Sequence, residues 1–584
     1  MQTVRVAAVS GAGLTARSLV VRATRPAADG RFGHGLEVSS GATAVVSRAL
    51  VDANHAIAVF ASDEGSSLEL TDAVVRGTRP RASDLQIGRG MNVQLAARVT
   101  ASRVLLEDNT ELGVFVTSAG TELALSDAIV RGTRSQESNG RLGRGIAVYG
   151  GSRAELDRVV LDRNREHGAF ASDRGSLLVL RDGLVRDTEP RDADRLFGRG
   201  VEVIMGAHAE LTRVHLDRNR EFGVLGAFEG TELALTDVAV RDTEEGEEYG
   251  ELGRGVSVEL GVLATLTRVV LERNTQAGLY ASSENVPGEP RCAPGMLGPG
   301  AAGTRVMVSD LVVRETRAQT FEDFGGLGVM ARCGATVELT RALLESNRAV
   351  ALIAEEAGTR IVGADLVLRD TSAQPDGALG RALNLQLGAT AELSRVLAEG
   401  NREIALFVAT EGTRLVLADA IVRDTGPQEL TGIFGRGLNL QQGASAEVSR
   451  AVIEGSLDVG VFVASEGTRA VLTDFVVRDV RARACAATTC ADAPAGMALV
   501  TYLGASAEVS RFSIARAELC AVQIARGGQL DLRDGEVVES AVGVCLQEAG
   551  YDTARLTDNV LFRDNGATLE ATSYPVPEPV DPDL

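Results

Sequence analysis

The pattern of apolar and polar positions along this chain repeats, and the stretch from Ala154 to Thr188 shows it most clearly. Three short apolar runs, GAFAS, SLLVLRD and GLVRD, follow one another with turns that contain Gly between them. Alternation with a period of two predicts β-strands, and no run has a helical period of 3.6 residues. The stretch therefore predicts three short strands joined by tight turns.

Two sets of landmarks carry this pattern along the chain. A Gly-x-Gly opens successive units about 55 residues apart, at Gly33, Gly88, Gly143, Gly198, Gly253, Gly326 and Gly435. Within each unit an Asn landmark and a Thr landmark alternate, as in Asn54, Thr78, Asn109 and Thr133. The step from Asn to Thr is 24 residues, and the step from Thr to Asn is 30 or 31. A 24-residue template thus repeats about twenty times, and a fixed period of this kind is typical of a solenoid.

Three strands per coil of 24 residues resemble the right-handed parallel β-helix, the pectate-lyase-like architecture. The resemblance implies an all-β solenoid of about twenty coils that occupies residues 1–565 as a single β-helix. Insertions near 285–302 and 481–494 interrupt it, and residues 566–584 form a Pro- and Asp-rich tail that we expect to be disordered. No covering segment precedes the first coil, so we expect the chain to be part of a longer protein.

Charged residues follow the same register. Two residues before each landmark the sign of the charge alternates from one landmark to the next, beginning with Arg22, Asp52, Arg76 and Glu107. Six residues before each landmark it alternates in the opposite phase, beginning with Arg48, Asp72, Arg103 and Asp127. Equivalent positions of successive coils are stacked neighbours in a parallel β-helix, so each charge should lie between two opposite charges. A slip by one coil would bring like charges together, and the pattern therefore fixes the register of the coils. The Asn landmarks should form a hydrogen-bonded ladder at a turn.

Composition narrows the classes of function. The formal net charge of −21 makes nucleic acid a poor partner, because a polyanion would be repelled over most of the surface. No apolar run reaches the 18 residues that a membrane-spanning helix needs. All basic residues are Arg, which excludes chemistry that depends on a lysine amine.

Most motifs that resemble catalytic sets have a structural explanation. Gly33-His34-Gly35 is similar to the Gly-His-Gly of polygalacturonases, but the Asn-Thr-Asp, Asp-Asp and Arg-Ile-Lys motifs of that family do not accompany it. The Val-Arg-Asp-Thr sequence recurs with minor changes along the chain, whereas an active site normally occurs once. The remaining histidines form no metal-binding spacing, and we expect them to be incidental surface residues: His55, His167, His208 and His215.

The densest acidic cluster lies in the loop after Thr243. It contains Glu244, Glu245, Glu247 and Glu248, and the preceding loop adds Asp192 and Asp194. Carboxylates of this kind could bind Ca²⁺, but no spacing matches a defined calcium loop, and a solvated acidic loop is the favoured interpretation. If the protein is an enzyme, Asp192, Asp194, Glu245 and Glu248 are its candidate catalytic residues. No other cofactor is expected.

Six cysteines point to an oxidising compartment, because an even number in loops suggests disulfides. The positions favour two pairs, Cys292–Cys333 and Cys485–Cys490. Cys520 and Cys545 lie on adjacent coils, but their template positions differ by about three residues, which argues against that pair.

The extra residues of every second coil follow the Thr landmarks and vary in sequence. Variable loops on a constant scaffold are where a solenoid carries binding. The leading hypothesis is therefore a non-enzymatic extracellular or cell-surface β-helix whose loop side binds a polysaccharide or a protein. The alternatives are a polysaccharide lyase or glycoside hydrolase of the pectate-lyase-like type, and a purely structural spacer.

Overall fold

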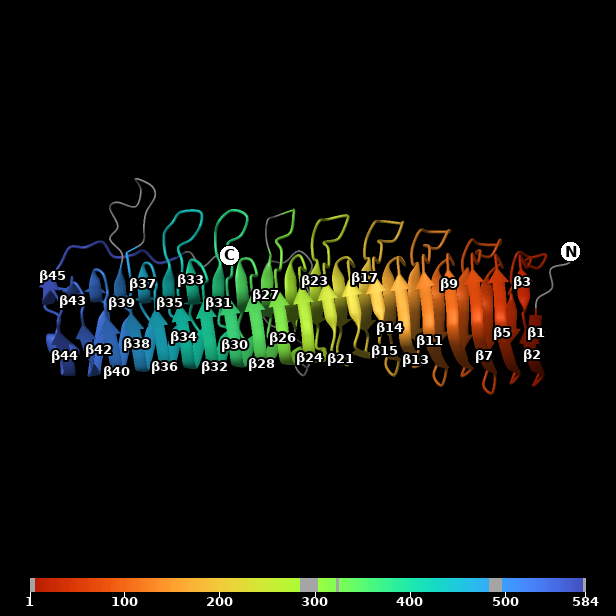
Figure 1. The fold of residues 1–584 in the computed structure, drawn as a ribbon, viewed down its shortest axis with the longest axis horizontal. Coiled ribbons are helices and arrows are strands. Elements are labelled where there is room, and N and C mark those ends of the chain that lie inside the picture. Colours follow the sequence, from red (N-terminus) through yellow and green to blue (C-terminus); the bar gives the residue numbers. More distant parts are fainter. Residues whose placement is uncertain (1–5, 284–291, 293–302, 322–324, 483–495, 581–584) are drawn as a thin grey trace. The chain divides into compact units, whose positions relative to one another are not determined.

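The computed structural model describes residues 6–283, 292, 303–321, 325–482 and 496–580 (Figure 1). The chain divides into two compact units. Unit 1 comprises Met1–Gln276 with Leu297–Val306, and unit 2 comprises Ala277–Met296 with Met307–Leu584. Each unit is a right-handed parallel β-helix, because its chain alternates between two all-parallel sheets, named A and B below, and every strand pairs with the equivalent strand of the next coil.

The described sheet A strands of unit 1 are β1 (Val6–Ala8), β4 (Leu36–Val38), β6 (Ile57–Ser62), β8 (Arg89–Gln94), β10 (Leu112–Thr117), β12 (Arg144–Tyr149), β14 (His167–Ser172), β17 (Arg199–Ile204), β20 (Phe222–Ala227) and β23 (Arg254–Glu259). Its sheet B strands are β2 (Gly13–Arg17), β3 (Val20–Arg22), β5 (Thr43–Asp52), β7 (Ser67–Arg76), β9 (Arg98–Glu107), β11 (Glu122–Arg131), β13 (Arg153–Asp162), β15 (Leu177–Arg181), β16 (Leu184–Arg186), β18 (His208–Thr212), β19 (His215–Asp217), β21 (Glu232–Thr236), β22 (Ala239–Arg241) and β24 (Leu263–Glu272).

Unit 2 repeats the arrangement. Its sheet A strands are β25 (Ala277–Ser282), β27 (Leu327–Arg332), β29 (Val350–Glu355), β31 (Arg381–Gln386), β33 (Ile404–Ala409), β35 (Arg436–Gln441), β37 (Val459–Ala464), β39 (Met497–Tyr502), β41 (Cys520–Ala525), β43 (Val542–Leu546) and β45 (Ala567–Ala571). Its sheet B strands are β28 (Thr336–Glu345), β30 (Arg360–Arg369), β32 (Thr390–Glu399), β34 (Arg414–Arg423), β36 (Ser445–Glu454), β38 (Arg469–Arg478), β40 (Ser506–Ala515), β42 (Gln529–Val538) and β44 (Asp558–Arg563). Strand β26 (Arg305–Arg314) crosses the boundary of the units, and a short 3₁₀ turn spans Thr553–Leu556.

The second and third strands expected in each coil are joined into one bent strand of sheet B. Strand β7, for example, is ten residues long, and its inward alternation is interrupted at Asp72, which has a φ of 54°. In some coils of unit 1 the bend divides the strand in two, as in β15 and β16. The bend coincides with the charged position six residues before each landmark, so the ladder residues turn the chain as well as carry charge.

The core of each unit is a stack of small and branched side chains, such as Val51, Val75 and Leu106, which face inward from successive coils of sheet B. The Asn landmarks lie inside this stack. Asn109 accepts hydrogen bonds from the backbone N–H and the hydroxyl of Thr78, and its amide donates to the carbonyl of Val75. Each Asn of this kind thus satisfies backbone groups of the coil before it, which is why the Asn and Thr landmarks alternate.

The charge ladder pairs on one side only. Arg103 binds both oxygens of Asp72 across the 31-residue step, at 2.6 and 3.1 Å, and Arg131 binds Glu107 across the 24-residue step. A guanidinium group binds one carboxylate through two N–H groups, so the carboxylate of the coil on its other side lies farther away. The row of charges six residues before the landmarks pairs across the longer step, and the row two residues before them pairs across the 24-residue step. Between Asp52 and Arg213, and again between Asp310 and Arg511, each pair of neighbouring coils is therefore joined by one of these ion pairs.

The C-terminal segment differs from the expected disordered tail. Strand β45 extends the helix beyond residue 565, and the chain then turns back over the outer face of sheet A in unit 2 (Figure 1). Tyr574 and Val576 pack there against a buried cluster that includes Phe462 and Tyr502. Apolar residues between the prolines give the segment enough buried surface to become ordered, which composition alone did not indicate.

Candidate functional site

The loops after the Thr landmarks are preformed. In the loop after Thr188, Arg191 donates its N–H to the carbonyl of Leu196, and Arg195 donates to the carbonyl of Arg191. The same pattern closes the loops after Thr78, Thr133, Thr243 and Thr425. Successive loops also bond to one another, since Ala193 donates its N–H to the carbonyl of Gly140 and Leu430 donates to that of Gly377. The described loops of unit 1, and the loops after Thr371 and Thr425 in unit 2, therefore form a ridge of variable sequence on a fixed backbone, called the loop ridge below.

Large apolar side chains project from the loops. Leu85 and Tyr249 in unit 1 are 47% and 61% exposed, and Phe321 and Leu430 in unit 2 are 69% and 63% exposed. Their positions in the loops place them where the sequence varies between repeats. Exposed apolar and aromatic residues held on a rigid loop are available for a partner at little entropic cost.

Two adjoining depressions lie where the loops leave unit 1. Each measures about 500 Å³, and Asp108 and Arg134 line both of them. The rest of the lining is mostly charged and hydroxylated, and includes Arg79, Glu137 and Arg165. This surface suits a polar, extended ligand better than a small apolar one.

The acidic residues predicted as catalytic or calcium-binding do not converge. Asp192 binds Arg165 at 2.7 Å, and Asp194 binds Arg191 at 2.6 Å. The hydrogen bond from Arg191 holds the pKa of Asp194 below its usual value. Each of these carboxylates thus has an arginine partner on the same or a neighbouring loop.

The acidic loop after Thr243 behaves similarly. Glu244 binds Arg220 at 2.9 Å, and Glu247 accepts a hydrogen bond from Arg195 Nε at 3.1 Å, which lowers the pKa of Glu247. Glu248 is exposed, and Glu245 is partly exposed. In the described part of the chain these oxygens do not gather into a group of three or more close enough to share a cation.

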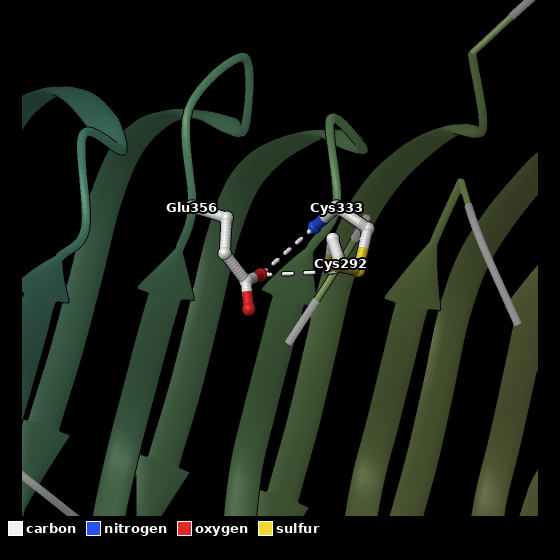
Figure 2. A group of neighbouring side chains, drawn as sticks. All are labelled: Cys292, Cys333 and Glu356. Carbon is white, nitrogen blue, oxygen red and sulfur yellow. Dashed lines mark hydrogen bonds between the residues drawn. A yellow bond between two sulfur atoms is a disulfide. The ribbon is translucent and has the colours of Figure 1, made fainter. Parts of the chain in front are cut away.

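One group with metal-ligating atoms does occur among the described residues, formed by Cys292, Cys333 and Glu356. Figure 2 shows that the two cysteines form a disulfide, as predicted, and that the carboxylate of Glu356 accepts a hydrogen bond from the N–H of Cys333 at 3.1 Å. The disulfide removes both thiolates as ligands, so the group links Cys292 to the turn after β27 rather than presenting a metal site.

The second disulfide joins Cys520 and Cys545, with a Cα–Cα distance of 6.0 Å. The offset between their template positions argued against this pair, and that prediction was wrong. Both side chains belong to the same buried cluster of sheet A, which brings the sulfurs together despite the offset. The predicted pair Cys485–Cys490 lies outside the described residues.

Sequence reasoning missed a row of buried ion pairs on the outer face of sheet A. In several coils the Arg after the opening Gly binds an acidic residue 22 positions later, as Arg89 binds Glu111 at 2.7 Å and Arg199 binds Glu221 at 2.7 Å, whereas Arg254 bonds Gln276 at that place. Arg144–Glu166, Arg381–Glu403 and Arg436–Asp458 repeat the pair. The sequence contained a signal for these pairs, because Asn-x-Glu follows Gly-Arg-Gly at a constant distance in the repeats that open at Gly88, Gly143 and Gly198.

Each of these arginines also stacks on an aromatic ring, and several of the acids hold a loop. Arg144 lies 4.0 Å above the ring of Phe170, and Arg381 lies 4.1 Å above that of Phe407. Glu166 accepts the N–H of Leu142, the last residue of a loop, at 2.6 Å. The pairs therefore anchor the ends of the variable loops to sheet A.

One cluster on this face contains His167, whose position in the 55-residue repeat holds no other histidine. His167 was expected at the surface, but its side chain is 2% exposed. It bonds Glu202 through Nε2 at 2.8 Å, and Glu202 also binds Arg199 at 2.6 Å. Burial lowers the pKa of His167, whereas the charges of His167 and Arg199 outweigh burial and lower the pKa of Glu202.

Tyr149 completes this cluster. Its hydroxyl accepts a hydrogen bond from Arg144, and burial raises its pKa. Glu166, which shares Arg144, keeps a lowered pKa in spite of its burial, because of the charges of His167 and Arg144. A histidine, a tyrosine, two glutamates and two arginines thus meet at one point, although they are packed against Phe170 and Phe197 and present little surface to solvent.

No protein-family model matches this chain, and no curated protein matches it either. Solved structures similar to it include pectate lyase Pel9A, with 9% identity, a TM-score of 0.31 and coverage of 52% of this chain and 68% of that one. The periplasmic alginate epimerase AlgG has 7% identity, a TM-score of 0.24 and coverage of 91% and 78%. The PL6 family alginate lyase AlyGC has 9% identity, a TM-score of 0.24 and coverage of 97% and 96%. Likeness at this level assigns no activity to this chain.

Proposed function

We propose that this protein is a non-enzymatic β-helix scaffold, extracellular or at the cell surface, whose loop side binds a polysaccharide or protein partner. The observation that carries the proposal is the ridge of stacked loops, with exposed apolar tips beside depressions lined by charged groups. Two of the four candidate catalytic acids, Asp192 and Asp194, have arginine partners, which supports it further because a paired, ionised carboxylate is a poor general acid or base at neutral pH. The disulfides Cys292–Cys333 and Cys520–Cys545 suit an oxidising compartment.

Among the described residues no helix is long and apolar enough to cross a membrane. The proposed location rests on the two disulfides.

A binding experiment tests this function. Immobilised protein is titrated with acidic and neutral polysaccharides, with and without Ca²⁺, while the release of unsaturated or reducing ends is followed in the same samples. We expect saturable binding of at least one polymer without turnover. Arg134→Ala should weaken that binding at least tenfold, since Arg134 lines both depressions. Arg98→Ala, on sheet B, is the matched control, and its side chain is 69% exposed. Equal effects of the two changes would contradict the proposal.

The cluster around His167 favours a second candidate function, a polysaccharide lyase or hydrolase. Here Tyr149 and Glu166 both bond Arg144, and Glu202 bonds both Arg199 and His167. Turnover that is abolished by His167→Gln, with the fold intact by circular dichroism, would support this candidate. It would replace the scaffold proposal.

A further inference from the structure

The C-terminal segment lies on sheet A of unit 2 as an extended ligand would. Tyr574 and Val576 are half-buried against β37, β39, β41 and β43, and Val580 is buried against Ile404 and Phe407 of β33. Pro575 and Glu578 between them are exposed. Tyr574, Val576 and Val580 thus face the sheet, Pro577 and Pro579 are half-buried, and Pro575 and Glu578 face solvent.

The sheet also binds the backbone of this segment. The amide of Gln441 donates to the carbonyl of Val580 and accepts the N–H of the same residue at 3.0 Å. Arg436 Nη2 donates to the carbonyl of Glu578 at 2.7 Å, and Gln547 donates to the carbonyl of Tyr574. A bidentate amide–peptide contact of this kind fixes the direction and register of an extended chain but tolerates changes of its side chains.

The segment is about as extended as a polyproline II helix. From β43, beside Tyr574, to β35, beside Val580, there are four strand spacings, or about 19 Å. Six residues cover this distance at roughly 3.2 Å each, close to the polyproline II rise of about 3.1 Å. Pro575, Pro577 and Pro579 fix φ for that conformation, so little entropy is lost on binding.

The residues that hold Val580 occur again two coils away. Arg436, Asn439 and Gln441 are joined in a chain, in which Arg436 donates to Asn439 at 2.7 Å and Asn439 donates to Gln441 at 3.1 Å. Arg381, Asn384 and Gln386 on β31 form the same sequence pattern, and Arg381 donates to Asn384 at 2.6 Å. Asn384 and Gln386 are 0% and 4% exposed.

At this second set the hydrogen bonds are incomplete. Within the described residues Asn384 Nδ2 and Gln386 Oε1 have no hydrogen-bond partner. A buried amide left unpaired costs about 1–3 kcal/mol, so the set is suited to a ligand that supplies the missing groups. Two coils span about 9.6 Å, which is the length of about three residues of polyproline II. The spacing of the two sets therefore allows both to form hydrogen bonds with one continuous extended peptide.

We propose that the outer face of sheet A from β31 to β43 is a binding groove for an extended, proline-spaced peptide. The segment Ser573–Val580 is its exchangeable occupant within the same chain. The groove is a different surface from the loop ridge, and its ligand is chosen by backbone hydrogen bonds and by apolar residues placed between prolines.

The test uses the full chain with a protease site inserted between Thr572 and Ser573. After cleavage and desalting, a fluorescent synthetic peptide of residues 573–584 is titrated by anisotropy. We expect saturable binding to the cleaved protein and at least tenfold weaker binding to the uncut protein, whose groove is occupied. A peptide N-methylated at Val580, which cannot donate to Gln441, should bind at least tenfold more weakly. N-methylation at Glu578 is the control, because among the described residues no acceptor binds that N–H.

A protein variant supplies the complementary measurement. Gln441→Leu in the cleaved chain should weaken the peptide at least tenfold, and Gln94→Leu, the equivalent position in unit 1, should leave it within about twofold. Circular dichroism checks that both variants fold. Absence of binding to folded cleaved protein would overturn the proposal, as would equal loss from the two N-methyl peptides or displacement of the peptide by polysaccharide alone. These results are independent of the effect of Arg134→Ala on the loop side.

Discussion

The buried pair Arg381–Glu403 offers a quantitative test of how the loops are anchored. The two side chains are 3% and 1% exposed. Glu403 accepts hydrogen bonds from Arg381 Nε at 3.1 Å and from the N–H of Leu379, at the end of a loop, at 2.6 Å. Glu403→Leu therefore leaves the buried guanidinium of Arg381 without a carboxylate partner, and it also removes the hydrogen bond that holds Leu379 at the end of the loop.

Removing one member of a buried ion pair costs about 3–5 kcal/mol, because the remaining charge stays desolvated. At about 1.4 kcal/mol for each factor of ten, local opening of these coils should become roughly 10² to 10³ times more frequent or more. The stacking of Arg381 on Phe407 and its bond to Asn384 persist, so the lower part of the range is expected. Coils of a solenoid open locally, which makes hydrogen exchange of β31 and β33 the appropriate assay.

The double variant Arg381→Met with Glu403→Leu separates charge burial from loss of shape. Replacing both partners with apolar residues is often close to neutral, so the double variant should recover most of the stability that Glu403→Leu loses. Asp365→Asn is the control, because its pair with Arg395 is exposed on both sides and should matter little. The reasoning is refuted if Glu403→Leu leaves exchange of β31 and β33 unchanged, or if the double variant is as unstable as the sum of the single changes.

Three further predictions follow from the same structure. Burial lowers the pKa of His167, so near and below the ordinary histidine pKa the unfolded state binds more protons than the native state, and unit 1 should lose stability as the pH falls from 7 to 5. His167→Gln should reduce the change of melting temperature with pH in that window. An unchanged dependence of the melting temperature on pH would contradict the assignment. Replacing both Cys520 and Cys545 with Ala should cost about 2–4 kcal/mol and speed proteolysis after β39, whereas equal cleavage of both proteins would show that the disulfide is not structural. Millimolar Ca²⁺ should leave the melting temperature unchanged, since Glu244 and Glu247 have arginine partners, and a rise that Glu247→Gln abolishes would reveal a calcium site.

Repetition explains why the fold could be predicted and much of the site could not. The period of the landmarks depends on contacts between equivalent positions of neighbouring coils, and such contacts leave a regular mark in the sequence. The pair of Arg89 and Glu111 leaves a mark too, at a constant 22 residues, but it was hidden among more frequent charges. His167 has no counterpart at its repeat position and carries no periodic signal, so only its burial on sheet A, against the same ring of Phe170 as Tyr149, identifies the cluster.

The sequence by itself determined the coil length, the inward alternation, the places where loops leave and the antiphase of the charges, because each of these is a local or nearest-coil property. The tertiary structure decided which neighbour each charge binds, since a guanidinium fork accommodates one carboxylate. It also decided that Cys520 reaches Cys545 and that Val580 returns to Gln441, 139 residues earlier in the chain. Contacts of that range depend on the outer face of sheet A, a surface that exists only after the coils have stacked.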